Sequence, residues 1–248
     1  MYSFAVFYEK IDSKPELLPF PEVFMEIYPI ARIFTDFPAK FGIPRQSGII
    51  SNKSIIVFEK KFRSDDAIRG IDGYSHLWLI WEFTEAKQQS VRLTVRPPRL
   101  GGNTRVGVFA TRSPFRPNSL GLSCVRLSEV RHGTPDGTVL IVEGADILSG
   151  TPIYDIKPYL PFTDSRPDAL GGFGENIRSG ITQVHFACDI PAGLNGEKLE
   201  TLKSILLEDP RPHYQNDGER IYAFEFADRR IKFTADGSTV TVTEITDF

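Results

Sequence analysis

Between about residues 22 and 165, this 248-residue chain consists largely of short β-branched and aromatic runs separated by tight turns. No segment of helical length and periodicity separates these runs. An Asp136–Gly137 pair between the last two is typical of a β-hairpin turn. The pattern predicts an antiparallel sheet that closes into a barrel. The runs span residues 54–59, 76–83, 106–111, 122–127 and 138–143.

The pattern changes beyond a polar, Gly-rich stretch at 163–180. Apolar residues between 195 and 209 fall on one helical face, which predicts a helix. Strand-like runs follow at 222–226, 230–234 and 239–245, and Asp236–Gly237 predicts a second hairpin. We therefore expect a mainly β protein with a small C-terminal α+β domain. The expected divisions are a lead-in at 1–21, a barrel domain at 22–165, a linker at 166–189 and the second domain at 190–248.

Positive charge is concentrated in one part of the chain. The 29 Lys and Arg against 32 Asp and Glu give a net charge of −3, which argues against a general nucleic-acid binder. Yet the window from Arg92 to Arg116 holds six arginines and no Asp, Glu or Lys. Arginine suits bidentate contact with phosphates and carboxylates, so the window predicts an anion-binding loop. The alternative is a solvated loop whose arginines pair with acids elsewhere.

Several familiar kinds of site are absent from the sequence. It contains no P-loop, no dinucleotide-binding glycine fingerprint and no GxSxG nucleophile motif. The four histidines are scattered, so we expect no metal site. Two cysteines, Cys124 and Cys188, exclude a disulfide framework. Without a membrane-length apolar run or a signal-peptide pattern, we expect a cytoplasmic protein.

Two segments combine charge with proline-constrained backbone. In GVFATRSPFRPNSLG (107–121), the prolines favour an extended, turning loop that can hold two guanidinium groups and exposed amides. Such a loop suits an anionic or zwitterionic ligand. The segment DILSGTPIYDIKPYLP (146–161) predicts a rigid wall that presents backbone carbonyls.

With these segments the chain resembles the TsaA-like family, also called the TrmO or YaeB family. The resemblance runs in the family's order from about residue 22 to 235. It implies a β-barrel methyltransferase that uses S-adenosylmethionine, acts on N6-threonylcarbamoyladenosine in the tRNA anticodon loop and forms a homodimer. The other motifs that carry it are FGIPRQSG (41–48), AIRGIDGYSHLW (67–78), VRPPRLGGN (95–103) and DPRPHY (209–214).

The resemblance also implies site residues, although it assigns no catalytic residue. The chain has Ser119-Leu120 and Ser149 where the family often has Pro-Ile and Asp. The implied cofactor-binding residues are Pro44, Arg45, Gln46, His76, Leu77, Arg112, Leu122, Ala145, Asp146, Ile147 and Leu148. The implied substrate- and RNA-binding residues are Arg96, Arg99, Arg105, Arg116, Asn118, Lys157, Tyr159 and Arg211.

Other interpretations of these residues remain open. His76 could be a core histidine, and Asp146 could cap a turn rather than accept hydrogen bonds from a cofactor. At the level of the whole protein, one alternative is a non-catalytic RNA-binding barrel. Another is an S-adenosylmethionine-dependent methyltransferase that acts on a small molecule.

Overall fold

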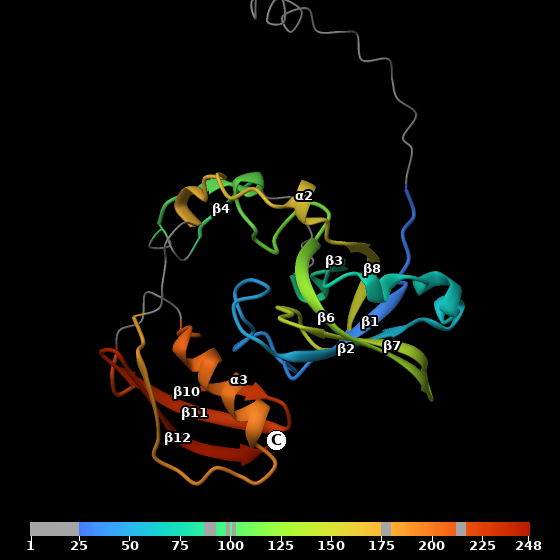
Figure 1. Cartoon of the computed structure of the whole chain (residues 1–248). Helices are drawn as coiled ribbons and strands as arrows, with labels where there is room; N and C mark the ends of the chain where they lie inside the picture. Colours follow the sequence, from blue (N-terminus) through green and yellow to red (C-terminus); the bar gives the residue numbers. More distant parts are fainter. Residues whose placement is uncertain (1–24, 87–92, 98–99, 101–102, 175–179, 212–216) are drawn as a thin grey trace, which may run out of the picture.

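The computed structural model describes residues 25–86, 93–97, 100, 103–174, 180–211 and 217–248. Within them the strands form a closed barrel, a four-stranded sheet and a two-stranded ribbon (Figure 1). The strands are β1 (Ala31–Phe34), β2 (Lys53–Phe58), β3 (His76–Glu82), β4 (Thr94–Val95), β5 (Val106–Gly107), β6 (Leu120–Thr134), β7 (Gly137–Glu143), β8 (Thr151–Pro158), β9 (Gln183–Phe186), β10 (Tyr222–Phe226), β11 (Arg229–Asp236) and β12 (Thr239–Asp247). The helices are α2 (Pro161–Asp164), α3 (Gly196–Leu207) and the 3-10 turns η1 (Lys60–Phe62), η2 (Asp65–Ile68), η3 (Ile71–Gly73), η4 (Thr84–Ala86), η6 (Val108–Ala110) and η7 (Gly172–Gly174).

Six antiparallel strands close the barrel in the order β1-β2-β7-β6-β3-β8, and β8 pairs back with β1. Side chains alternate between the inside and the outside of the barrel. In β3, for example, Leu77, Leu79 and Trp81 are buried, whereas the residues between them are only partly buried. This period of two is what a strand with one packed face requires. The predicted mainly β fold with an antiparallel barrel is confirmed.

The strand prediction was wrong in part of the region between β4 and β6. Of the run 106–111, only Val106 and Gly107 form a strand, and η6 follows at once. The turn is stabilised because Val108 O accepts hydrogen bonds from the backbone N–H of Thr111 at 3.2 Å and from its hydroxyl at 2.8 Å. The strand-like runs identified in the sequence also did not include β1 or β8. In β8, Pro152 and Pro158 interrupt the usual strand pattern.

The C-terminal sheet has the order β10-β11-β12-β9, with β9 parallel to β12. The predicted helix at 195–209 is α3, which buries Leu202, Ile205 and Leu206 against this sheet. Strand β9 lies inside the range 166–189 that the sequence pattern assigned to a linker. Because Ile181 also belongs to the C-terminal core, we propose that the second domain begins near this residue rather than at 190.

The segment that connects β1 to β2 leaves the barrel and completes the core of the C-terminal domain. Phe37 and Ile50 are both buried there, and the Phe37 and Phe226 ring centroids lie 6.0 Å apart. The backbone N–H of Ala227 donates to Asp36 O at 2.7 Å. Residues assigned to the barrel range are therefore part of the C-terminal hydrophobic core, which is separate from the core inside the barrel.

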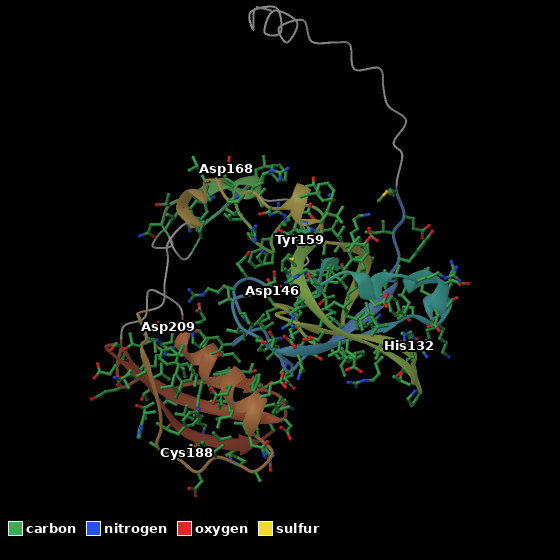
Figure 2. All side chains as sticks on the ribbon, viewed as in Figure 1. His132, Asp146, Tyr159, Asp168, Cys188 and Asp209 are labelled. Carbon is green, nitrogen blue, oxygen red and sulfur yellow. The ribbon has the colours of Figure 1, made fainter. Side chains whose placement is uncertain are left out.

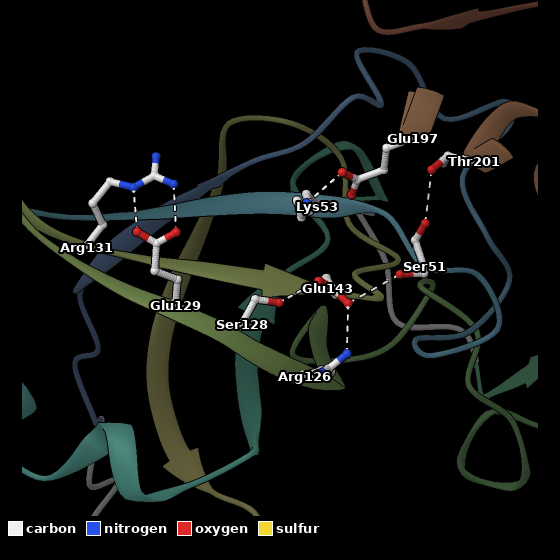
Figure 3. A network of polar contacts seen from close by, with 9 residues as sticks. All are labelled: Ser51, Lys53, Arg126, Ser128, Glu129, Arg131, Glu143, Glu197 and Thr201. Carbon is white, nitrogen blue, oxygen red and sulfur yellow. Dashed lines mark hydrogen bonds and ion pairs between the residues drawn. The ribbon is translucent and has the colours of Figure 1, made fainter. Parts of the chain in front are cut away.

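Figure 3 shows polar contacts among the barrel strands and between the barrel and α3 of the C-terminal domain. Lys53 of β2 lies 2.6 Å from the Glu197 carboxylate of α3, and the Thr201 hydroxyl donates to Ser51 O at 3.0 Å. Glu143 of β7 accepts from Ser128 at 2.6 Å. Because exposed ion pairs contribute little free energy, we expect the Lys53–Glu197 pair to add little to the association of the domains. In the described parts of the chain, no helix is long and apolar enough to cross a membrane.

The joint between the domains leads to a test of stability with Gly42→Ala. Gly42 has φ +99°, and a Cβ there would overlap the Phe224 ring. Gly70 also has a positive φ, +85°, but has open space around it. Left-handed backbone costs an alanine about 1 to 2 kcal/mol, and overpacking adds about 1 to 3 kcal/mol. Denaturant unfolding should therefore show Gly42→Ala to be less stable than Gly70→Ala by about 1 to 3 kcal/mol. Equal losses of stability in Gly42→Ala and Gly70→Ala would contradict tight packing between Gly42 and Phe224.

Candidate functional site

Two loops meet at one end of the barrel, the 44–48 loop and the 144–148 loop. Gly48 N–H donates to Gly144 O at 2.9 Å, and Gly144 N–H donates to Asn52 O at 3.1 Å. Gly144 has φ +84°, and a Cβ there would lie 3.2 Å from the Gly48 backbone. Glycine at 144 therefore permits both the left-handed turn and the close approach. The contact brings two sequence-predicted cofactor segments together.

Asp146 is the central charged group of this region (Figure 2). Its Oδ1 accepts a hydrogen bond from the Ser123 hydroxyl at 2.5 Å. Burial raises the pKa of the Asp146 carboxyl above its ordinary value, while the Ser123 hydroxyl, the backbone N–H groups of Asp146 and Ser47, and the Arg112 charge act in the opposite direction. Asp146 is thus a partly buried acceptor surrounded by donors.

Arg112 contacts the loop at 44–48, and its charge acts on the Asp146 carboxyl. Its guanidinium donates to Gln46 Oε1, and the Gln46 amide donates to Arg45 O at 2.5 Å. Arg45 in turn donates to Asp209 O of the C-terminal domain at 2.7 Å. Three of the predicted cofactor residues therefore form a chain of contacts that begins beside Asp146 and ends on the second domain.

Other predicted cofactor residues have their side chains in the barrel core. Leu77, Ala145 and Ile147 are each 0% exposed, so neither their side chains nor their backbone groups are accessible in this structure. The carbonyl of Ala145 already accepts from Asn52 at 3.1 Å, and that of Ile147 accepts from Thr35 at 3.0 Å. The expected wall of carbonyls is therefore hydrogen-bonded within the chain at these two positions. Pro44 and Leu148 are partly buried in the two loops.

His76 belongs to a separate aromatic group on the outside of the barrel. Its ring centroid lies 6.1 Å from that of Tyr159, and Tyr159 lies 5.8 Å from Trp78. The backbone N–H of Leu160 and the Trp78 indole both donate to Asp164 Oδ2, each at 2.9 Å, and these bonds lower the pKa of Asp164. Leu122, which is 59% exposed, projects outward from the neighbouring strand β6.

Strand β6 lies between the aromatic group and Asp146. Ser123 faces the barrel interior and contacts Asp146, whereas Leu122 and Cys124 face the other side. In the described residues, no hydrogen bond or ion pair joins His76 or Tyr159 directly to Asp146. Among the described contacts, Gln46 is bonded to Arg112, whose charge acts on Asp146, whereas His76 contacts Ser75 and Tyr159.

The predicted RNA-binding residues lie in several different environments. Arg96, Arg105 and Asn118 are exposed, and Arg116 is partly buried with its guanidinium on Thr111 O at 2.7 Å. Lys157 pairs with Asp155 at 3.0 Å. Arg99 lies outside the described residues.

Arg211 has internal partners instead. Its Nε and Nη2 donate to the two oxygens of Asp209 at 2.7 and 3.0 Å, and Nη1 donates to Ala235 O at 3.3 Å. Its side chain is 10% exposed. These contacts give Arg211 a structural role, and we leave it out of the proposed RNA contacts.

Sequence reasoning did not single out Ser47, Ser123 or Trp81 as site residues. The Ser47 hydroxyl accepts from Cys124 N at 3.1 Å, which fixes the 44–48 loop on β6. Ser123 donates to Asp146, and Trp81 donates to Ser123. One signal was available: in β6, Ser123 occupies an inward-facing position between Gly121 and Val125. A polar side chain on the packed face of a strand requires a partner.

Family models of known proteins match both domains of the chain. The family model described as the tRNA-methyltransferase O N-terminal domain matches residues 32–165, and the TrmO C-terminal domain matches residues 182–248. The chain is 38% identical over 213 residues to the tRNA (adenine(37)-N6)-methyltransferase of Escherichia coli, covering 82% of this chain and 90% of that protein.

Two further proteins extend the comparison. A Pseudomonas aeruginosa protein, RcsF, whose name refers to S-adenosylmethionine-dependent methyl transfer, is 38% identical over 196 residues, which cover 76% of this chain and 83% of that one. The crystal structure of TrmO from Pseudomonas aeruginosa superimposes with a TM-score of 0.74 at 28% identity, over 92% of this chain and all of the other.

The raised pKa of Asp146 predicts a pH-dependent effect of Asp146→Asn. Because the folded protein holds this proton more tightly than the unfolded chain, protonation of Asp146 favours folding. Its contribution to the free energy of unfolding is present at low pH and decreases as pH rises above the ordinary value of 3.8. The wild type should therefore lose stability relative to Asp146→Asn as pH rises, by at most about 1.4 kcal/mol per pH unit. Denaturant unfolding of both proteins at a series of pH values measures this difference; the opposite trend would mean that the donors outweigh burial.

Proposed function

Because the chain belongs to the TrmO family, we propose that it is a tRNA methyltransferase that transfers a methyl group from S-adenosylmethionine to N6 of adenine 37. Both family domains are present in order, and they cover most of the chain. The Escherichia coli relative is named for this reaction and is matched over 90% of its length. We further propose, from the family resemblance, that the substrate base is N6-threonylcarbamoyladenosine in the anticodon loop.

The convergence of Gln46, Arg112 and Asp146 is the observation that carries the proposal for the cofactor. These residues come from three distant segments: Gln46 accepts a hydrogen bond from Arg112, and the Arg112 charge acts on the Asp146 carboxyl. S-adenosylmethionine has a carboxylate, an ammonium group and ribose hydroxyls, which need a cation and acceptors of these kinds. The residues present therefore fit this cofactor.

When bound, S-adenosylmethionine supplies a methyl group on a positively charged sulfur. In-line displacement requires alignment and exclusion of water, so the main task of the chain is to orient the two reactants. Arg112 and Asp146 would hold the charged and hydroxyl groups of the cofactor in a fixed direction. The acceptor nitrogen of a ureido-adenine is a poor nucleophile. A guanidinium such as Arg116 near the ureido group would stabilise the anion left when its proton is removed.

The substrate side of the proposal concerns the exposed cations. Arg96 and Arg105 project from the β4–β5 ribbon, where both side chains are exposed. Such arginines can bind the phosphates of a single-stranded loop while its bases are read elsewhere. Tyr159 offers an aromatic face close to His76 and Trp78, which suits stacking with a base.

We also propose the homodimer that the family resemblance implies. Phe109 of η6 and Phe162 of α2 are 75% and 85% exposed. Large apolar side chains at this exposure are consistent with a surface that a second copy covers.

The cofactor part of the proposal predicts that the purified protein binds S-adenosylmethionine and that Arg112→Ala weakens this binding at least tenfold. The loss follows from removal of the cation beside Asp146. Isothermal calorimetry measures the dissociation constants. Arg131→Ala is the matched control, because Arg131 pairs with Glu129 at 2.8 Å on an exposed part of β6 and should leave binding unchanged.

Nucleoside analysis after reaction with tRNA completes this test. Mass spectrometry should find methylated threonylcarbamoyladenosine in tRNA incubated with the protein and S-adenosylmethionine. If the protein binds tRNA but no cofactor, the non-catalytic RNA-binding barrel is the better interpretation. If it consumes the cofactor only with small molecules, the tRNA assignment is wrong.

The RNA part predicts a change in salt dependence. If Arg96 and Arg105 contact phosphates, each change to alanine should flatten the plot of log affinity against log salt by roughly 0.7 to 1 unit. Filter binding or anisotropy with tRNA over a salt series measures the slope, again with Arg131→Ala as the control. Unchanged slopes would return these arginines to the solvated-loop interpretation.

A further inference from the structure

A buried relay of two hydrogen bonds ends on Asp146. The Trp81 indole N–H donates to Ser123 Oγ at 2.9 Å, and the Ser123 hydroxyl donates to Asp146 Oδ1 at 2.5 Å. Ser123 is 0% exposed and Trp81 is 5% exposed. We propose that Trp81 and Ser123 are positioning residues for the methyl-transfer reaction, which fix the direction of the Asp146 carboxyl toward the cofactor. This inference rests on the proposed function.

The chemistry of the two donors determines the direction of the relay. An indole N–H can only donate, so Ser123 Oγ must act as its acceptor. The single hydroxyl hydrogen of Ser123 is then available for Asp146 alone. One oxygen of Asp146 is thereby held from inside the barrel. The rest of its acceptor capacity is left for the backbone N–H of Ser47 and for a ligand.

The indole itself is held by its neighbours. Trp81 of β3 is opposite Gly121 of β6, and a Cβ at 121 would overlap the indole ring. The Phe83 ring lies against it, with 4.3 Å between ring centroids. Gly121 therefore provides the space in which the indole reaches Ser123. Gly144 lies two residues before Asp146, and its left-handed backbone allows the loop to turn there. The Asp146 carboxyl thereby reaches the Ser123 hydroxyl, whose oxygen also accepts from the Trp81 indole.

A purely structural role makes different predictions from a positioning role. If the relay only satisfies buried polar groups, its loss lowers stability and leaves cofactor affinity unchanged. If it positions Asp146, its loss weakens cofactor binding by way of Asp146. A double-mutant cycle with Asp146→Asn separates these two cases, because only a positioning role makes the two effects on binding non-additive.

The matched control is another serine of β6. Ser128 also donates to a carboxylate, Glu143 Oε1 of β7, at 2.6 Å, and neither residue is among the proposed cofactor residues. Ser128→Ala therefore removes the same kind of bond from the same strand. It should bind S-adenosylmethionine with the wild-type dissociation constant.

The experiment measures S-adenosylmethionine binding by calorimetry for the full-length wild type, Ser123→Ala, Trp81→Phe and Ser128→Ala. We expect a roughly tenfold weaker dissociation constant for Ser123→Ala, since a charge-assisted hydrogen bond then no longer fixes the Asp146 carboxyl. Trp81→Phe should also weaken binding, because Ser123 can then rotate away. In the Asp146→Asn background, Ser123→Ala should change the dissociation constant by less than twofold.

Wild-type affinity in a folded Ser123→Ala variant would overturn the inference, as would full additivity with Asp146→Asn. If Ser123→Ala does not fold, Trp81→Phe carries the same test, because it removes only the first donor of the relay. Failure of the wild type to bind S-adenosylmethionine would instead contradict the proposed function. The two failures are therefore distinguishable in one set of titrations.

Discussion

The close backbone contact between Gly48 and Gly144 is the constraint on which the proposed site depends. It joins a loop between β1 and β2 to the loop after β7, although the two are almost a hundred residues apart in sequence. A side chain at 144 would separate them, because its Cβ would press on the Gly48 backbone. Once they are in contact, Ser47 N–H reaches the Asp146 carboxyl and Gln46 reaches Arg112. The charged part of the site is therefore built on a backbone contact.

The second domain supports the same loop from the other side. Phe37 and Ile50 flank the 44–48 loop and are buried in the C-terminal core, while Arg45 donates to Asp209 O at 2.7 Å. Asp209 is in turn held by its bonds to Arg211. The loop is thus anchored on β6 by Ser47 and on the second domain by its flanking residues. Although the implied cofactor residues all precede residue 150, their geometry depends on residues after 200.

Local pattern was sufficient where a strand or turn depends on near neighbours in sequence. The Asp136–Gly137 and Asp236–Gly237 pairs do join β6 to β7 and β11 to β12, and the apolar face at 195–209 is that of α3. Local pattern was insufficient for β8, because Pro152 and Pro158 obscure its strand pattern. It was also insufficient for β9, because this strand is defined by its parallel pairing with β12. The stretch after Gly107 turns into η6 because of hydrogen bonds to Val108 O, which strand propensity does not contain.

The sequence by itself determined the fold class, the family and the residue types of the site, because alternation, turn pairs and ordered motifs are all properties of nearby residues. It placed Gln46, Arg112 and Asp146 among the candidates, and the structure brings these three together. Only the tertiary structure decided that Leu77, Ala145 and Ile147 point into the core, that Arg211 is bound to Asp209, and that Ser123 and Trp81 stand behind Asp146. The physical reason is that burial and hydrogen-bond partners are set by strand register and loop contacts between residues far apart in the chain.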